Sequence, residues 1–125
     1  MTDTPSFLIV DDEPEMCWVL EHVFKRAGYN CFSALSGQEA MALAKKTHFR
    51  LVFLYAKLPD IEGLELARQM RRRLPGIPIV MISGYFYKDD DMIKSALSSG
   101  LIQHFISKPF NHEEILQIIR TCLPD

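Results

Sequence analysis

Short apolar runs of strand length recur along the chain, and each ends in polar residues. They occupy residues 7–10, 51–54, 79–82 and, more briefly, 105–107. Continuous apolar runs of this length are typical of strands that are buried on both faces. Residues 29–34 predict a further strand between the first two runs. The pattern therefore predicts five strands.

Apolar residues between these strands recur at helical spacing. The first predicted helix begins at Pro14, which suits a first helical position, and ends before Gly28. Its apolar stripe consists of Met16, Val19, Leu20, Val23, Phe24 and Ala27. Ser36 and Glu39 form a capping-box pattern at the start of a second helix, which carries apolar residues on one side.

Three more helices complete the alternation. They are predicted at about residues 63–74, at 89–99, and after residue 111, where Asn111 and Glu114 cap the last one. Five strands alternating with five helices predict an α/β domain with right-handed crossovers and a parallel sheet covered on both faces. No repeat, low-complexity stretch or linker divides the chain, so residues 1–125 are expected to form one domain.

Composition places the chain in an ordinary globular class. It has 125 residues, 48% of them apolar and 24% charged, with a net charge of −2. This balance disfavours a direct nucleic-acid partner or a polybasic membrane surface, and the arginines at 68 and 71–73 are expected to form a solvated face. No apolar run approaches the roughly 20 residues of a membrane span, and no secretion signal is present. A cytoplasmic protein with no membrane role is expected.

The carboxyl ends of the predicted strands carry the candidate chemistry. Asp11 and Asp12 follow the first strand, Tyr55 follows the run 51–54, Ser83 follows 79–82, and Lys108 follows 105–107. In an open parallel α/β sheet the functional crevice lies outside the carboxyl ends of the strands. These five residues are therefore expected to converge.

Several separated motifs show a family resemblance. They are Ile-Val-Asp-Asp-Glu at 9–13, Leu-Pro-Asp-Ile-Glu-Gly at 58–63, Ser-Gly at 83–84 and Lys-Pro-Phe at 108–110. Together they resemble the receiver domain of bacterial two-component response regulators over essentially the whole chain. The resemblance implies a three-layer flavodoxin-like (βα)5 fold with a parallel five-stranded sheet of order 2-1-3-4-5. It also implies a role in phosphorelay signal transduction.

One position departs from the family. Its phosphoacceptor is an aspartate four residues before the proline of the loop, and the same spacing from Pro59 falls on Tyr55. A phenol has an unperturbed pKa of about 10, so it is mostly neutral at pH 7, and its oxygen extends beyond the reach of a carboxylate. The resemblance thus predicts a pseudo-receiver without phosphorylation at the usual position.

The resemblance also implies roles for the other site residues. Asp12 would coordinate Mg²⁺ directly, Asp11 would act through water, and the backbone carbonyl of Lys57 would complete the metal shell. Ser83 and Lys108 would contact the phosphoryl group, and Ser83 and Phe105 would form the conformational switch. Because Tyr55 removes a ligand and Mg²⁺ demands near-ideal octahedral oxygen coordination, Mg²⁺ binding is expected to be weak or absent.

Losing an acid also changes the empty pocket. Lys108 is expected to pair with Asp11 or Asp12, and the Tyr55 hydroxyl to donate a hydrogen bond to either acid, which would lock the pocket in one state. The segment 100–105 is one residue longer than the family pattern, so the surface beside Phe105 is expected to be reshaped.

Three function classes follow. The first is an atypical receiver that is not an enzyme and acts through a protein partner (a histidine kinase, an output domain or another regulator) or as a homodimer. The second is a receiver phosphorylated on another acid such as Asp60, which otherwise reads as a turn or capping residue. The third is a flavodoxin-fold enzyme or nucleotide binder, which lacks a glycine-rich cradle after the first strand. The chain is either whole or the N-terminal part of a longer regulator.

Overall fold

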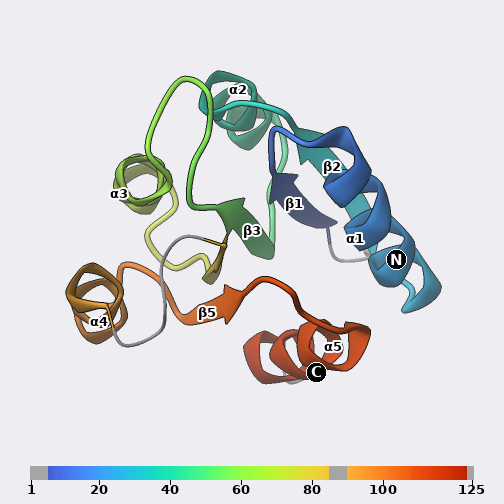
Figure 1. Cartoon of the computed structure of the whole chain (residues 1–125). Helices are drawn as coiled ribbons and strands as arrows, with labels where there is room; N and C mark the ends of the chain where they lie inside the picture. Colours follow the sequence, from blue (N-terminus) through green and yellow to red (C-terminus); the bar gives the residue numbers. More distant parts are fainter. Residues whose placement is uncertain (1–5, 85–89, 124–125) are drawn as a thin grey trace.

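A computed structural model of the chain describes residues 6–84 and 90–123, in which strands and helices alternate (Figure 1). The strands are β1 (Ser6–Val10), β2 (Asn30–Ala34), β3 (Leu51–Tyr55), β4 (Ile79–Ser83) and β5 (His104–Ser107). The helices are α1 (Pro14–Arg26), α2 (Gly37–Lys46), α3 (Gly63–Arg73), α4 (Asp91–Ser98) and α5 (His112–Cys122). No helix in this described part of the chain is long and apolar enough to cross a membrane.

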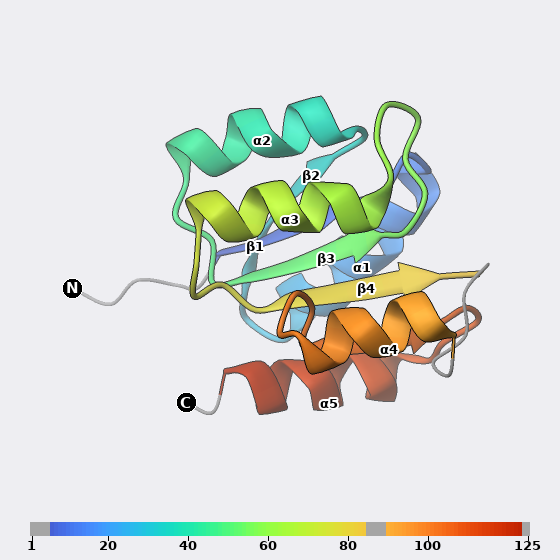
Figure 2. The same ribbon diagram turned by 90° about the vertical axis from the view of Figure 1, so that its left-hand side faces the viewer.

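The sheet is parallel throughout, with strand order β2-β1-β3-β4-β5. The strands run side by side between two layers of helices (Figure 2). Because every neighbouring pair is parallel, all five end at the same edge of the sheet. This is the flavodoxin-like (βα)5 architecture, so the predicted fold class and strand order are confirmed.

Alternate residues of each strand supply two apolar cores. Leu8, Val10 and Leu54 contribute to the larger core, which includes buried side chains of α2, α3 and α4. Phe7 and Phe53 contribute to the smaller core against α1 and α5. Because successive side chains of a strand point to opposite faces, one continuous apolar run supplies both layers.

The buried face of α1 and two element boundaries differ from the sequence prediction. Ala27 is exposed, whereas Cys17, outside the predicted stripe, is buried on α1 and donates its Sγ–H to the Asp11 carbonyl. Tyr29 precedes β2 and stacks on Phe7 with ring centroids 4.6 Å apart. Helix α4 begins at Asp91, and the predicted start at residue 89 lies outside the described residues.

The caps of α2 and α5 follow the predicted pairs in different ways. Asn111 and Glu114 form a complete reciprocal capping box at the start of α5. At α2, Ser36 Oγ accepts the Glu39 N–H, but the Glu39 side chain accepts the N–H of Leu35 rather than that of Ser36. The Ser36–Glu39 pair therefore caps α2, but the bond to the Glu39 side chain comes from Leu35, the residue before the cap.

The loop between β3 and α3 folds tightly back on itself. The Ala56 N–H donates to Ile82 O, and the Gly63 N–H donates to Ala56 O at 2.8 Å. The backbones of Lys57 and Glu62 form an isolated antiparallel β-bridge. A Cβ atom on Gly63 would lie 2.6 Å from the Tyr55 carbonyl oxygen and 2.8 Å from Ala56 Cα. Only glycine fits there, because the obstacle is backbone.

We therefore expect Gly63→Ala to destabilise the domain by about 2 to 4 kcal/mol, since either the loop or α3 must shift. The matched control is Gly76→Ala, where a Cβ would meet nothing within 4 Å and the change should stay within about 0.5 kcal/mol. Urea unfolding of both variants measures the difference. Equal effects of the two substitutions would contradict the proposed steric role of Gly63.

Candidate functional site

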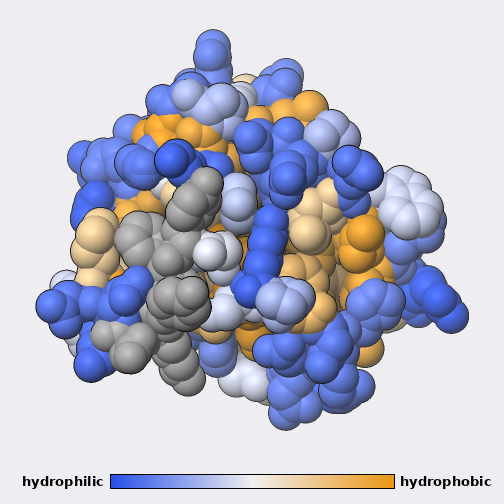
Figure 3. Space-filling model, in the orientation of Figure 1, coloured by the Kyte–Doolittle hydropathy of each residue, from blue (hydrophilic) through white to orange (hydrophobic). Residues whose placement is uncertain are grey.

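The predicted site residues meet at the carboxyl edge of the sheet. A hollow of about 350 Å³ is lined there by Asp12, Glu13, Tyr55, Lys57, Leu58 and Pro59. Figure 3 views the molecule toward this edge, where hydrophilic side chains lie beside hydrophobic patches. Of the five residues expected to converge, Asp11, Tyr55 and Lys108 lie within contact distance of one another through the Lys108 ammonium group.

Lys108 is the centre of this arrangement. Its backbone N–H donates to Ser83 O at 2.9 Å, and a cis peptide bond joins it to Pro109. The Lys108 Nζ atom lies 3.3 Å from Glu13 Oε1, 4.0 Å from Asp11 Oδ2 and 4.0 Å from the centroid of the Tyr55 ring. The ammonium group therefore has two anionic contacts and one aromatic contact.

This geometry changes two details of the sequence prediction. Within residues 6–84 and 90–123, Lys108 pairs with Asp11 and Glu13, not with the exposed Asp12. Tyr55 contacts the Lys108 ammonium group with the face of its ring. Its hydroxyl does not donate to Asp11 Oδ2, because that oxygen has no hydrogen-bond partner among residues 6–84 and 90–123. The ammonium group is attracted to the ring's negative face, so the tyrosine joins the cluster without using its oxygen.

Asp11 carries a buried carboxyl group. It is 2% exposed, and its Oδ1 accepts the Glu13 N–H at 2.9 Å. Burial raises the pKa of Asp11 to about 6, although the Glu13 N–H and the Lys108 charge lower it. The neighbouring carboxylates of Glu13 and Asp12 add smaller upward contributions. The folded state therefore holds the Asp11 proton more tightly than an exposed aspartate would.

Ser83 and Phe105 lie on the paired strands β4 and β5, and β5 leads into Lys108. Ser83 ends β4, is fully buried, and pairs in register with Ser107, the residue before Lys108. Phe105 lies opposite Met81 and is half-buried against the larger core. A buried hydroxyl and a half-buried ring stand on adjacent strands at the two positions predicted for the switch.

Asp60 has a structural role that the sequence left open. Its two carboxylate oxygens accept the N–H groups of Gly37 at 2.9 Å and Gln38 at 3.0 Å. These bonds lower the pKa of Asp60, because they favour its charged form. Asp60 therefore caps the N-terminus of α2 from the loop after β3.

Arg71 is wrongly predicted as part of a solvated face. Its half-buried guanidinium donates to the carbonyls of Pro75, Ile77 and Leu101 and to Gln103 Oε1. The same Gln103 oxygen accepts the Ile79 N–H at 2.7 Å, and Gln103 Nε2 donates to Gly100 O. The Gln103 side-chain amide thus joins the segment before β5 to Ile79 and to Gly100.

The sequence did not predict that Glu13 contacts Lys108 or that the Gln103 side chain bonds to Ile79 at the start of β4. Glu13 stands in the acidic run 11–13, but the run does not indicate which acid the lysine contacts. Gln103 stands in the segment 100–105, which is one residue longer than the family pattern. This extra residue is the feature of the sequence that points to an altered structure there. Both roles depend on side-chain directions that spacing alone does not fix.

The pKa of Asp11 gives the domain a specific pH dependence. Its folded-state pKa is raised from 3.8 to about 6, so its stabilising contribution is full below about pH 3.8 and is lost as pH rises through about 6. The loss is on the order of 3 kcal/mol. Asp11→Asn should remove this contribution, so the variant gains stability relative to wild type between pH 4 and 7.

The measurement is urea unfolding at a series of pH values, with Asp12→Asn, an exposed neighbour, as the control. An unchanged difference between Asp11→Asn and wild type across the whole pH range would contradict the raised pKa.

The ring contact predicts a difference between two substitutions at Tyr55. Tyr55→Phe keeps the aromatic face and should preserve the Lys108 contact, whereas Tyr55→Leu should lose about 1 kcal/mol of stability. A double-mutant cycle of Tyr55→Leu with Lys108→Met should give a coupling of about 0.5 to 2 kcal/mol. The idea fails if Tyr55→Phe is as destabilising as Tyr55→Leu, or if the coupling is zero.

Comparison with known proteins agrees with this geometry. Residues 7–120 match the family described as the response regulator receiver domain. The chain is 32% identical over 119 residues to the sporulation initiation phosphotransferase F of Bacillus subtilis, covering 95% of this chain and 94% of that protein. It is 30% identical to the probable transcriptional regulatory protein TcrX of Mycobacterium tuberculosis, covering 94% of this chain but only 49% of that protein.

Solved structures show the same fold. A CheY-like response regulator receiver domain protein from Methanospirillum hungatei superposes with a TM-score of 0.90 at 26% identity, covering 98% of this chain and 95% of that chain. The response regulator TrrA of Thermotoga maritima, solved in complex with Mg²⁺ and beryllofluoride, gives a TM-score of 0.82 at 28% identity, covering 96% of this chain and all of that chain. The fold, the edge where the polar residues converge and the family match agree: this chain belongs to the response regulator receiver domain family.

Proposed function

We propose that this chain is an atypical receiver domain that is not phosphorylated at the end of β3 and signals through contacts with other proteins. The observation that carries the proposal is Tyr55, which occupies the last position of β3 and lies with its ring under Lys108 Nζ. By the family pattern, this is the position of the acceptor carboxylate. A phenol at this position does not offer the carboxylate that serves the family as nucleophile and metal ligand.

The residues at this edge do not fit Mg²⁺. Among residues 6–84 and 90–123, no group of three or more histidine, cysteine or acidic side chains is arranged to hold a metal ion. Within the described residues Asp11 Oδ2 accepts no hydrogen bond, but the Lys108 ammonium lies 4.0 Å away and supplies the positive charge there. Mg²⁺ requires near-ideal octahedral oxygen coordination, which an aromatic face does not supply. Weak or absent Mg²⁺ binding is therefore part of the proposal.

The side chains of the site are proposed to hold it in one state. Lys108, which contacts phosphate oxygens in the family pattern, already contacts Glu13, Asp11 and the Tyr55 ring. Three contacts on one ammonium group favour a fixed position over an exchange between partners. Ser83 and Phe105 would then serve as a static part of the surface that a partner binds.

The alternative, a receiver phosphorylated on Asp60, is less well supported. Both Asp60 oxygens accept backbone N–H groups of α2, so phosphorylation would remove the cap of that helix. The alternative makes a distinct prediction, and the experiment below includes it.

The proposed partner is a protein: a histidine kinase, an output domain, another regulator or a second copy of this chain. Residues 1–125 are proposed to form one domain, to act in the cytoplasm, and to have no enzymatic activity or direct nucleic-acid contact of their own. Receiver domains are signalling domains, which supports a signalling role, and the chain spans about half the length of TcrX.

Restoring the carboxylate tests the proposal. We expect the amide NMR spectrum of the wild-type domain to be unchanged by Mg²⁺ with beryllofluoride, a mimic of an acyl phosphate. Tyr55→Asp should respond at Ser83, Phe105 and Lys108, because it returns both a nucleophile and a metal ligand. Tyr55→Asn, of similar size but without the charge, is the matched control and should not respond.

Asp60→Asn separates the two candidate functions. If the wild-type spectrum responds to the mixture and Asp60→Asn abolishes the response, Asp60 is the acceptor and the proposal is wrong. A wild-type response that survives Asp60→Asn would also overturn it, since some other acid would then accept the group.

A further inference from the structure

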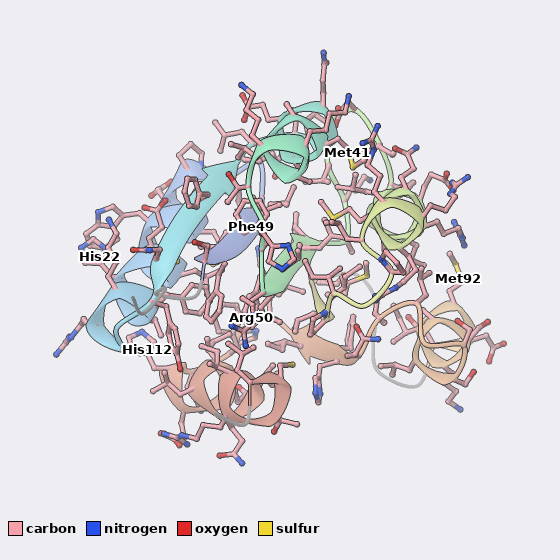
Figure 4. The ribbon with its side chains drawn as sticks, turned by 180° about the vertical axis from the view of Figure 1, so that it is seen from behind. His22, Met41, Phe49, Arg50, Met92 and His112 are labelled. Atoms are coloured by element: carbon pink, nitrogen blue, oxygen red, sulfur yellow. The ribbon has the colours of Figure 1, made fainter. Side chains whose placement is uncertain are left out.

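A second cavity lies at the opposite end of the sheet from the cluster around Lys108. Segments 48–50, before β3, and 73–78, from the last residue of α3 to the start of β4, line a hollow of about 410 Å³. Figure 4, drawn from behind, shows Phe49 and Arg50 near the middle of this end of the molecule. The cavity is thus separate from the family's functional edge, which Figure 1 views from the other side.

The rim of this cavity is cationic. His48, Arg50 and Arg73 line it and are exposed, and no acidic residue among 6–84 and 90–123 lines it. Within the described part of the chain, neither Arg50 nor Arg73 forms an ion pair. The neighbouring Arg72, in contrast, lies 3.8 Å from Glu65 and does not line the cavity. Two guanidinium groups are therefore available to a ligand.

The floor of the cavity is apolar and held in place. Phe49 and Ile77 are buried, and Leu74 and Pro78 are half-buried. The Phe49 ring packs edge-on against Phe32 with centroids 5.5 Å apart. The Arg71 guanidinium donates to the carbonyls of Pro75 and Ile77, which fixes the wall formed by residues 75–77. The cavity is therefore largely formed before any ligand arrives.

Cations are concentrated in the segments that lead to the cavity, although the whole chain has a net charge of −2. The acidic run 11–13 lies at the carboxyl edge, whereas cations gather in the segments leading to the cavity. These cations are Lys45, Lys46, Arg50, Arg71, Arg72 and Arg73. Such an uneven distribution attracts anions to one end of a nearly neutral protein.

We propose that this cavity binds a small organic phosphate of about nucleotide size. Guanidinium groups match the oxygens of a phosphate in a bidentate geometry, and Arg50 and Arg73 stand on the two segments that face the hollow. Pockets for small ligands are typically about 300 to 1,000 Å³, apolar over most of their lining, with a few polar groups that orient the ligand. The apolar floor would receive the organic part while the arginines hold the phosphate.

The first test is a titration of the labelled full chain with ADP, followed by amide NMR. Saturable shifts are expected in segments 48–50 and 73–78, with little change at Asp11 and Lys108. Pyrophosphate, which has only the anionic part, and adenosine, which has only the organic part, should each bind at least about tenfold more weakly. Shifts centred on the carboxyl edge, or no saturable shift with ADP, would overturn the proposal.

Substitutions at the rim give the second test. Arg50→Gln and Arg73→Gln should each weaken ADP binding by about tenfold, whereas Arg72→Gln, on the same helix but paired with Glu65, should leave it unchanged. All three side chains are exposed, and urea unfolding checks that the variants fold. Equal weakening by Arg72→Gln would mean a diffuse basic patch and would overturn the proposal. A preference for a single-stranded oligonucleotide that depends equally on Arg72 would also overturn it.

Discussion

The carboxyl edge of this protein is organised around one ammonium group in a partly buried position. Lys108 is held by its own backbone bond to Ser83, and its side chain lies among the Asp11 carboxyl, the Glu13 carboxylate and the Tyr55 ring. Removing a charge from water is costly unless other groups compensate it, and here the turn after β1 and the end of β3 supply the compensation. The site is therefore defined by a cation that the fold must accommodate.

The backbone of the β3–α3 loop delivers Tyr55 to this cation. The return of the chain from Ala56 to Gly63 is so close that a single methyl group would collide with main-chain atoms. The position of the ring is therefore set by main-chain packing, and the side chain at residue 55 then decides the chemistry of the edge. The same backbone arrangement accommodates either a carboxylate or an aromatic ring at residue 55.

Much of the fold was predictable, because strand pattern and helix pattern differ in period. The runs at 7–10, 51–54 and 79–82 are apolar on both faces, and that continuity indicates a covered parallel sheet. The convergence of Asp11, Tyr55 and Lys108 also followed, since parallel strands end at one edge. The partners of Lys108 did not follow, because choosing Glu13 over Asp12 depends on the turn after β1. Arg71 was misread for a similar reason: its charge suggested solvent, whereas nearby carbonyl groups drew it inward.

The bonds from Asp60 to Gly37 and Gln38 tie two segments that are distant in sequence. The loop that begins directly after Tyr55 is anchored to the first turn of α2 by a carboxylate bridging two amides, and Gly37 leaves room for Ile61 and Asp60 to approach. A displacement of the loop after β3 would therefore move the first turn of α2, because the Asp60 carboxylate joins the two. The outer surface of α2 thus becomes a place where a change at residue 55 is felt, on the opposite face of the sheet from α1 and α5.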